Sequence, residues 1–506
     1  MKLNHLLIYS FSLMLLSFST HAQTTINLGQ TLTNSSSLSN VSTLENNGTI
    51  ENNGTLANLA SGILNNNGLL DNYLTQFLIN NGLLNNYGDL ENSGTLDNAG
   101  TWNNNSGSTL TNFNVINNAA TGQFNNDGML SSPGPIYNIG SWDNMDQGTL
   151  DLTGSTLDNY GNLENNFGVI FIRTTATLNN TPSGTIFNYW ILSNEGDLDN
   201  NGNLENDGSI NISGTLTNNA TLNNHSFLQA GDIAGAGSSN LLINNHTLNN
   251  SINAVISVSG KLENYDTLTN DLGGDLSIVS GATFDNKVGA LLDNGGRIIN
   301  QNTLINDGTL NNNLASQLIN SGALINSFSM TNDGDLSNSG SMDNLNGTLT
   351  NNGTLTNTGV LTNYSTLDNY DTLTSTGTLT NDGTMSVFGG TVDATSITNN
   401  GTFVFNGGTL SVDNFVGTLA NTGGTSSPGN APGTTNRTGD YSQDATSTLL
   451  IEIEGLIAGT EHDELLVSGT ATLDGTLQFE EDYGALALGD TFDILQAEVI
   501  AGTFAN

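Results

Sequence analysis

The chain has 506 residues, of which 60 are glycine and 5 are proline, and charged residues make up only 10% of it. Six lysines and arginines stand against 47 aspartates and glutamates, which gives a net charge of −41. Phosphate binding needs clustered cations, so this balance argues against nucleic acid as a partner and against adsorption to an anionic membrane surface. The absence of cysteine excludes disulfides, thiolate zinc sites and cysteine nucleophiles.

Residues 1–22 have the three parts of a secretory signal peptide. Lys2 supplies the positive start, an apolar run extends from Leu6 to Phe18, and Ala22 ends a stretch of mostly small residues. We expect cleavage after Ala22 and export of the mature chain. The apolar run is short for a bilayer span and no later segment approaches that length, so we expect no transmembrane segment in the mature chain.

From Leu44 onward, one large apolar residue returns every six or eight residues. An Asn usually stands two residues after this anchor and a Gly often two residues later, so the repeat unit reads Leu-x-Asn-x-Gly. In an extended segment, alternation places Leu and Asn on one face and the intervening residue on the other. A fixed short period over hundreds of residues is typical of a repeat fold.

We therefore predict an all-β fold in which residues 44–424 form a single elongated parallel β-helix, or β-solenoid, with residues 23–43 as its N-terminal cap. Three six-residue units would close a triangular coil of 18 residues, and two sixes with an eight would give 20. Inward asparagines on successive coils would satisfy one another's amides. Asn-x-Gly would form the corners through left-handed backbone angles. A helical repeat is disfavoured because Asn, Gly and Thr are weak helix formers.

The composition changes after Gly424. Residues 425–436 contain two Pro-Gly turns, and residues 437–506 are predicted to form a β-rich C-terminal cap. Four segments stand there in a characteristic order: Ser426–Gly433, Gly439–Gln443, Asp463–Gly469 and Gly489–Leu495.

Over residues 425–504, these segments resemble the C-terminal end of autotransporter-passenger-like and filamentous-haemagglutinin-like β-helix surface proteins. The resemblance implies a right-handed coil and a role in adhesion. It also implies export to the extracellular space or the outer cell surface of a Gram-negative-type bacterium, rather than retention in the periplasm. An autotransporter would continue into a membrane barrel, which this sequence does not show before Asn506, so we expect either a separate secretion partner or a truncated passenger.

The sequence predicts no catalytic, cofactor-binding or dedicated metal-binding residues. Of the histidines after the signal peptide, His225 and His246 stand at corner positions and His462 in a polar turn, and no nucleophile elbow, P-loop or zinc-protease motif occurs. We therefore predict that the chain is not an enzyme. The alternative, a polysaccharide-active enzyme on the same coil, would need converging acids near residues 167–193 or 229–260.

Acidic residues often follow the apolar anchor directly and would face water. Carboxylates stacked on successive coils would lie about 5 Å apart, and a divalent cation could bridge them. We expect the acids chiefly to keep the chain soluble, with weak, non-specific Ca²⁺ binding as the alternative and no dedicated metal site.

An aromatic cluster is the candidate ligand contact, because sugars stack on flat rings. It consists of Phe171, Phe187, Tyr189 and Trp190. The alternative is that these rings fill the interior or pack a loop onto the coil. Expected partners are surface glycans, host or matrix components, or other cells.

We predict a secreted or cell-surface structural β-solenoid, adhesin-like, that gathers affinity by multivalent contact along its length. Besides the enzyme, a second alternative is an ice- or mineral-binding repeat protein. That alternative rests on repeated threonines, namely Thr49, Thr55, Thr95, Thr348 and Thr354.

Overall fold

The computed structural model describes residues 18–20, 23–231, 240–429, 432–481, 487 and 489–505. The chain divides into two units, residues 1–262 and 263–506. Every regular element of the described residues is a β-strand, and each unit is a parallel β-solenoid of the right-handed type, which confirms the predicted fold class. None of the described segments forms a helix that is long and apolar enough to span a membrane.

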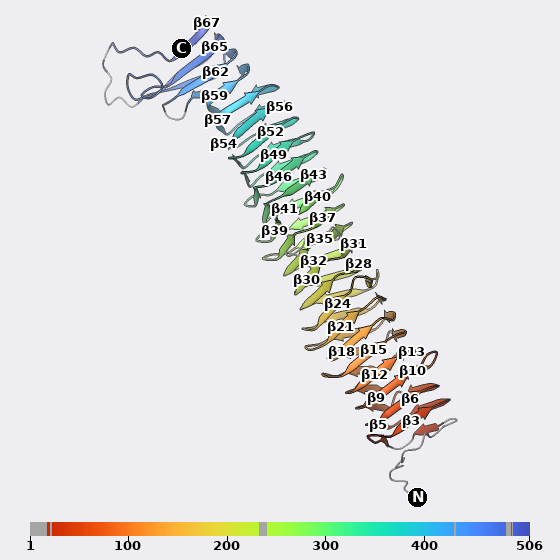
Figure 1. Cartoon of the computed structure of the whole chain (residues 1–506). Helices are drawn as coiled ribbons and strands as arrows, with labels where there is room; N and C mark the ends of the chain where they lie inside the picture. Colours follow the sequence, from red (N-terminus) through yellow and green to blue (C-terminus); the bar gives the residue numbers. More distant parts are fainter. Residues whose placement is uncertain are drawn as a thin grey trace. The chain divides into compact units, whose positions relative to one another are not determined.

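Most strands are four residues long, and three of them make one coil. In unit 1, β3 (Thr31–Asn34) pairs in parallel with β6 (Thr49–Asn52), and β6 pairs with β9 (Leu69–Asn72). Strand n thus pairs with strand n + 3, and Figure 1 shows β3, β6, β9 and β12 (Asp89–Asn92) as successive rungs of one face. Paired asparagines in the first coils are 18, 20 or 22 residues apart, so the predicted triangular coil is confirmed.

The predicted signal peptide lies outside the described residues except for β1 (Phe18–Thr20), which pairs with β4 (Ser37–Asn40). The segment 23–43, expected to cap the coil, contains β2 (Thr24–Ile26), β3 and β4. β2 pairs in parallel with β5 (Thr43–Asn46), so the coil geometry already holds in this segment.

Each short strand buries its second and fourth residues and turns its first and third outward. In β5, Leu44 and Asn46 are fully buried, while Thr43 and Glu45 are partly exposed. The same alternation repeats in strand after strand. The apolar anchors therefore fill the coil interior, and the acids that follow them face solvent, as the period of the sequence predicts.

The inward asparagines form hydrogen-bonded ladders along the coil. The Asn46 Nδ2 donates to Asn66 Oδ1 at 2.6 Å and to the Leu69 carbonyl at 2.8 Å, and Asn66 repeats both bonds with Asn86 and Asp89. The Gly48 N–H donates to Asn46 Oδ1 at 3.1 Å. Both ends of the buried amide are satisfied, which a buried polar group requires.

The corner glycines serve a different purpose from the one expected. Gly48, Gly68 and Gly88 do not have left-handed backbone angles, so that expectation is wrong for them. A Cβ on Gly68 would lie 2.1 Å from the Gly48 carbonyl oxygen, and one on Gly88 would lie 2.2 Å from that of Gly68. Glycine stands there because successive corners approach too closely for any side chain.

The regular pattern gives way to longer strands toward the end of unit 2. β57 (Thr391–Asn399) continues through a corner and pairs with both β54 (Thr372–Ser375) and β55 (Thr378–Asn381). The segment 425–436 contains β61 (Thr425–Pro428) and the start of β62 (Thr434–Thr438), and Asn430 and Ala431 lie outside the described residues. The expected C-terminal cap region also contains β65 (Glu464–Leu473), β66 (Thr476–Glu481) and β67 (Leu495–Gly502).

One ladder position lacks its neighbours. Asn194, at the end of β27 (Ile191–Asn194), pairs in register with Ile172 on one side and Ile212 on the other. Its Nδ2 donates to the Thr215 carbonyl at 2.7 Å, but its buried Oδ1 has no hydrogen-bond partner. This asparagine therefore carries the desolvation penalty of an unsatisfied acceptor, which ladder asparagines avoid.

We predict that Asn66→Leu destabilises the protein by about 1–3 kcal/mol more than Asn194→Leu. Asn66→Leu leaves Asn86 Oδ1 without the amide that donates to it, whereas Asn194→Leu removes an acceptor that is already unsatisfied. The midpoints of chemical denaturation of the two full-length variants measure the difference. Equal losses would show that the ladder bonds contribute nothing beyond packing.

Candidate ligand-binding surface

The four aromatic residues expected to contact ligand all lie on the outside of the coil in unit 1. Phe171 is the third residue of β24 (Val169–Ile172) and Phe187 the third of β26 (Thr185–Asn188), both outward positions. Tyr189 and Trp190 form the corner after β26 and are 37% and 48% exposed. The rings therefore do not fill the coil interior.

Three of these residues come together with a fourth ring that the sequence analysis missed. The rings of Phe187 and Tyr189 are nearly parallel at 8°, with centroids 6.2 Å apart. Trp190 packs against Phe167, at 6.1 Å and 52°, and Phe167 occupies the corner one coil earlier. We call Phe167, Phe187, Tyr189 and Trp190 the aromatic patch. Phe167 stands beside the corner glycine Gly168. The period alone does not show which corners lie next to each other on successive coils, so the sequence did not predict that Phe167 meets Trp190.

Phe171 belongs to a different face. Its strand β24 pairs with β21 (Thr149–Leu152) and β27, not with the strands that carry the patch. The Arg173 guanidinium lies 4.3 Å from the centre of the Phe171 ring, and its Nε lies 2.8 Å from Asp151 Oδ1. Hydrogen bonding to Asp151 raises the pKa of Arg173. Phe171 is thus covered by a cation of its own chain.

Carboxylates flank the aromatic patch on both sides. On this face, β26 lies between β23 (Asn162–Asn165) and β29 (Asn203–Asn206). The strand register places Phe187 directly between Glu164 and Glu205. Burial raises the pKa of Tyr189, and the nearby charges of Glu164, Asp207 and Glu205 raise it further. The rings therefore lie in a negative field.

Neighbouring side chains hold these carboxylates in place. Glu205 accepts hydrogen bonds from Asn203 and Asn223, each at 2.9 Å, and the His225 ring Nε2 lies 3.0 Å from its Oε2. Burial pushes the pKa of Glu205 up, but these three contacts outweigh it and leave the pKa below its usual value. Glu164 accepts from Asn162 Nδ2 at 2.6 Å. Both groups are oriented before any ligand arrives.

The histidines divide as follows. His225 and His246 are exposed corner residues, as expected. His462, expected in a polar turn, is fully buried, and its Nδ1 lies 3.1 Å from the Gly455 carbonyl oxygen. Within the described residues, no group of three His, Asp or Glu side chains is placed to hold a metal ion.

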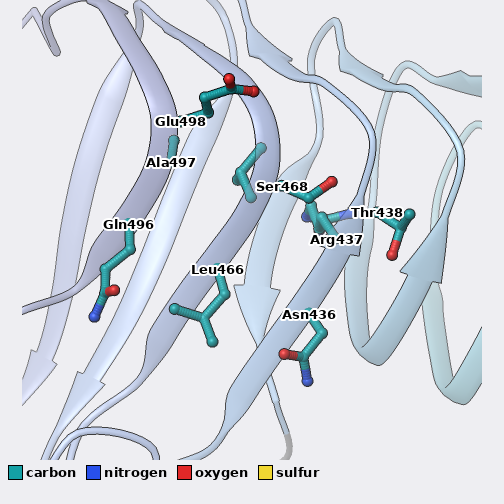
Figure 2. A pocket seen from close by; sticks show the side chains of 9 residues that line it. Asn436, Arg437, Thr438, Leu466, Ser468, Gln496, Ala497 and Glu498 are labelled. Atoms are coloured by element: carbon teal, nitrogen blue, oxygen red, sulfur yellow. The ribbon is translucent and has the colours of Figure 1, made fainter.

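A separate groove of about 470 Å³ lies in unit 2. Figure 2 shows it over β62, β65 and β67, where Asn436, Leu466 and Gln496 stand side by side in register. It contains none of the aromatic residues predicted to bind ligand. Its lining mixes neutral polar, apolar and charged residues, and consists of Asn436, Arg437, Thr438, Leu466, Val467, Ser468, Gln496, Ala497 and Glu498.

Arg437, beside this groove, is only 2% exposed. Its guanidinium lies 5.4 Å from the centre of the Phe415 ring and 5.3 Å from that of Tyr441, and its Nη2 donates to Ser426 Oγ. Burial lowers the pKa of Arg437 to about 10. The group is still a cation at neutral pH, and aromatic faces provide part of the stabilisation that a carboxylate would normally supply.

No family model matches this chain, and no curated protein matches it. Among solved structures, the chain is similar to a TibC-catalysed, hyper-glycosylated fragment of TibA, with 13% identity and a TM-score of 0.21. The match covers 64% of this chain and 92% of that one. A TM-score this low carries no argument about function. The β-solenoid itself is established by the strand pairing, whereas membership of an adhesin family stays a prediction.

Asp463 predicts a pH dependence in the C-terminal part of unit 2. Its buried carboxylate accepts the Gly433 and Glu452 N–H groups, each at 2.8 Å. Burial nevertheless raises the pKa of Asp463 to about 6. The folded state therefore holds this proton more tightly than the unfolded chain, whose Asp pKa is about 3.9. The contribution to stability is complete below about pH 4 and is lost as the pH rises through about 6.

Asp463→Asn mimics the protonated acid and should remove this dependence. Hydrogen exchange of the segment 448–470, corrected for intrinsic rates, should show wild type losing protection relative to the variant between about pH 4 and 6. Above about pH 7 the difference between the two proteins should stay constant. A difference that does not change across this interval would contradict the raised pKa.

Proposed function

We propose that this protein is a non-enzymatic, secreted or cell-surface structural scaffold, adhesin-like, that binds glycans. The observation that carries the proposal is the aromatic patch, two ring pairs on one strand and its adjoining corners, flanked by oriented carboxylates. Flat rings pack against the C–H faces of sugars, and fixed carboxylates accept their hydroxyl hydrogens. Because the backbone beneath is hydrogen-bonded on both sides, little further ordering is needed on binding.

A patch of four rings binds a single glycan weakly. Affinity for matrix components, host surfaces or other cells would come from many copies of the chain acting together on one surface. The proposed export rests on the predicted signal peptide, residues 1–22. Rows of stacked carboxylates, such as Glu51, Asp71 and Glu91, support weak, non-specific Ca²⁺ association.

The test compares Trp190→Ala with Tyr87→Ala in the full chain. Both residues are exposed corner aromatics of unit 1, but only Trp190 belongs to the aromatic patch. We expect Trp190→Ala to weaken binding across a panel of neutral and charged polysaccharides by roughly three- to tenfold. Tyr87→Ala should bind like wild type. If wild type binds no glycan, or if both variants lose binding equally, the proposal is wrong.

A row of threonines in unit 2 favours a second candidate, an ice- or mineral-binding face. The threonines expected from sequence do not form one row, because Phe77 lies in register between Thr55 and Thr95. The structure instead aligns one of them, Thr354, with six other threonines on successive strands of one face, about 4.8 Å apart: Thr372, Thr391, Thr409, Thr425, Thr448 and Thr476. The next outward position, two residues further along each of the first five of these strands, is occupied by Thr356, Thr374, Asp393, Ser411 and Ser427.

This candidate predicts thermal hysteresis in the full-length protein. Thr391→Lys places a charge in the middle of the row and should abolish most of the effect, because a lysine ammonium disrupts a regular hydroxyl surface. Thr303→Lys, at the equivalent outward position of β43 (Thr303–Asn306) and outside the row, is the control. Absence of thermal hysteresis in wild type removes the ice version of this candidate.

A further inference from the structure

We infer that the aromatic patch selects glycans that carry free amino groups, so that its preferred ligand is a cationic amino sugar. This inference rests on the proposed glycan-binding function and adds the chemical class of the ligand.

The first step is the spacing of rings and carboxylates. Glu164, Phe187 and Glu205 are register partners on three neighbouring strands, so the backbone of each glutamate lies one strand spacing, about 4.8 Å, from that of Phe187. Tyr189 stacks on Phe187 from the adjoining corner. A sugar lying on these rings would therefore have a carboxylate within reach at either edge.

The second step is the sign of the local charge. The faces of aromatic rings carry partial negative charge, so they attract a cation, as the carboxylates do. Hydrogen bonds from Asn203, Asn223 and His225 favour the ionised form of Glu205. Asp207 adds to the negative field around Tyr189.

Unit 1 has few basic groups to balance the negative charge of these carboxylates. Between residue 23 and the end of unit 1, the sequence contains Arg173 and Lys261 as its only arginine and lysine. Arg173 binds Asp151 and Glu195 and covers Phe171, on the neighbouring face. His225 contacts Glu205 through one carboxylate oxygen, Oε2, while Oε1 accepts the two asparagine amides.

These three features discriminate among sugars. A neutral sugar gains only ring stacking and hydrogen bonds, and a uronic acid is repelled by Glu164 and Glu205. A protonated amine gains attraction from both the rings and the carboxylates. For an exposed site, these two contributions together predict a preference of about tenfold for the free amine over its N-acetyl form.

The experiment measures binding of a glucosamine tetramer and of the fully N-acetylated tetramer to the full-length protein. At about pH 5.5 the amines of the glucosamine tetramer are protonated, and the lowered pKa of Glu205 keeps that carboxylate ionised. We expect the free-amine tetramer to bind about tenfold more tightly at low salt, and the preference to shrink at about 0.5 M salt. Short ligands limit contact with the acidic surface elsewhere.

Variants separate this site from general attraction to an acidic protein. Glu205→Gln and Glu164→Gln should each lower the amine preference while leaving the acetylated tetramer little changed. Trp190→Ala should weaken both ligands. Glu91→Gln, which removes an outward glutamate on the face that carries β12, is the matched control and should preserve the preference.

The outcomes distinguish failure of the amine inference from failure of the proposed glycan-binding function. Equal binding of the two tetramers that is lost in Trp190→Ala overturns the amine inference and supports glycan binding. An amine preference that survives Trp190→Ala and Glu205→Gln reflects net charge alone and also overturns the inference. Absence of Trp190-dependent binding to every glycan, in the tetramer experiment and in the polysaccharide panel, overturns the proposed function itself.

Discussion

The fold depends on a single recurring interaction, the amide-to-amide hydrogen bond between inward asparagines of successive coils. Each amide binds the next asparagine and the carbonyl of the first residue in the strand that follows it, as Asn46 does with Asn66 and Leu69. A slip of one residue would turn every buried side chain outward, so the ladder fixes the register. The outward residues then fall into straight rows, and the surface chemistry of each face follows from the sequence position by position.

The ladder is not needed at every coil. On one face of unit 1 the asparagine position is occupied instead by apolar residues, and Asn194 remains among them without a partner for its Oδ1. The apolar residues at this position are Leu152, Ile172, Ile212, Ala230 and Val258. Stacked apolar side chains therefore support the coil as well, provided that the replacement is shared by neighbouring coils. A lone polar residue in an apolar column is the unfavourable case, because its desolvation is not compensated.

The sequence predicts the part of the structure that depends on periodicity. Alternation and spacing were enough for the strands, the three-sided coil, the buried asparagines and the outward acids. The role of the corner glycines could not be predicted, because the close approach of Gly48 and Gly68 is a contact between coils. Face assignment also failed for Phe171, since coils of different length shift the phase of the repeat. The expected threonine row failed for another reason: Thr55 and Thr95 share a face, but Phe77 stands between them. The burial of His462 and Asp463 depends on a C-terminal region without a regular period.

The same rigidity limits what a ligand site on this scaffold can do. Outward side chains stand on strands paired on both sides, so a coil offers a flat, fixed surface and does not close around a ligand. Shape contributes little discrimination on such a surface, and charge contributes more. The register places Glu164 and Glu205 on opposite sides of Phe187, where neither can move away from a bound sugar without breaking its own hydrogen bonds. The selectivity proposed for the aromatic patch would therefore be electrostatic and already present in the unbound protein, whereas affinity would have to come from repetition of the site across many chains.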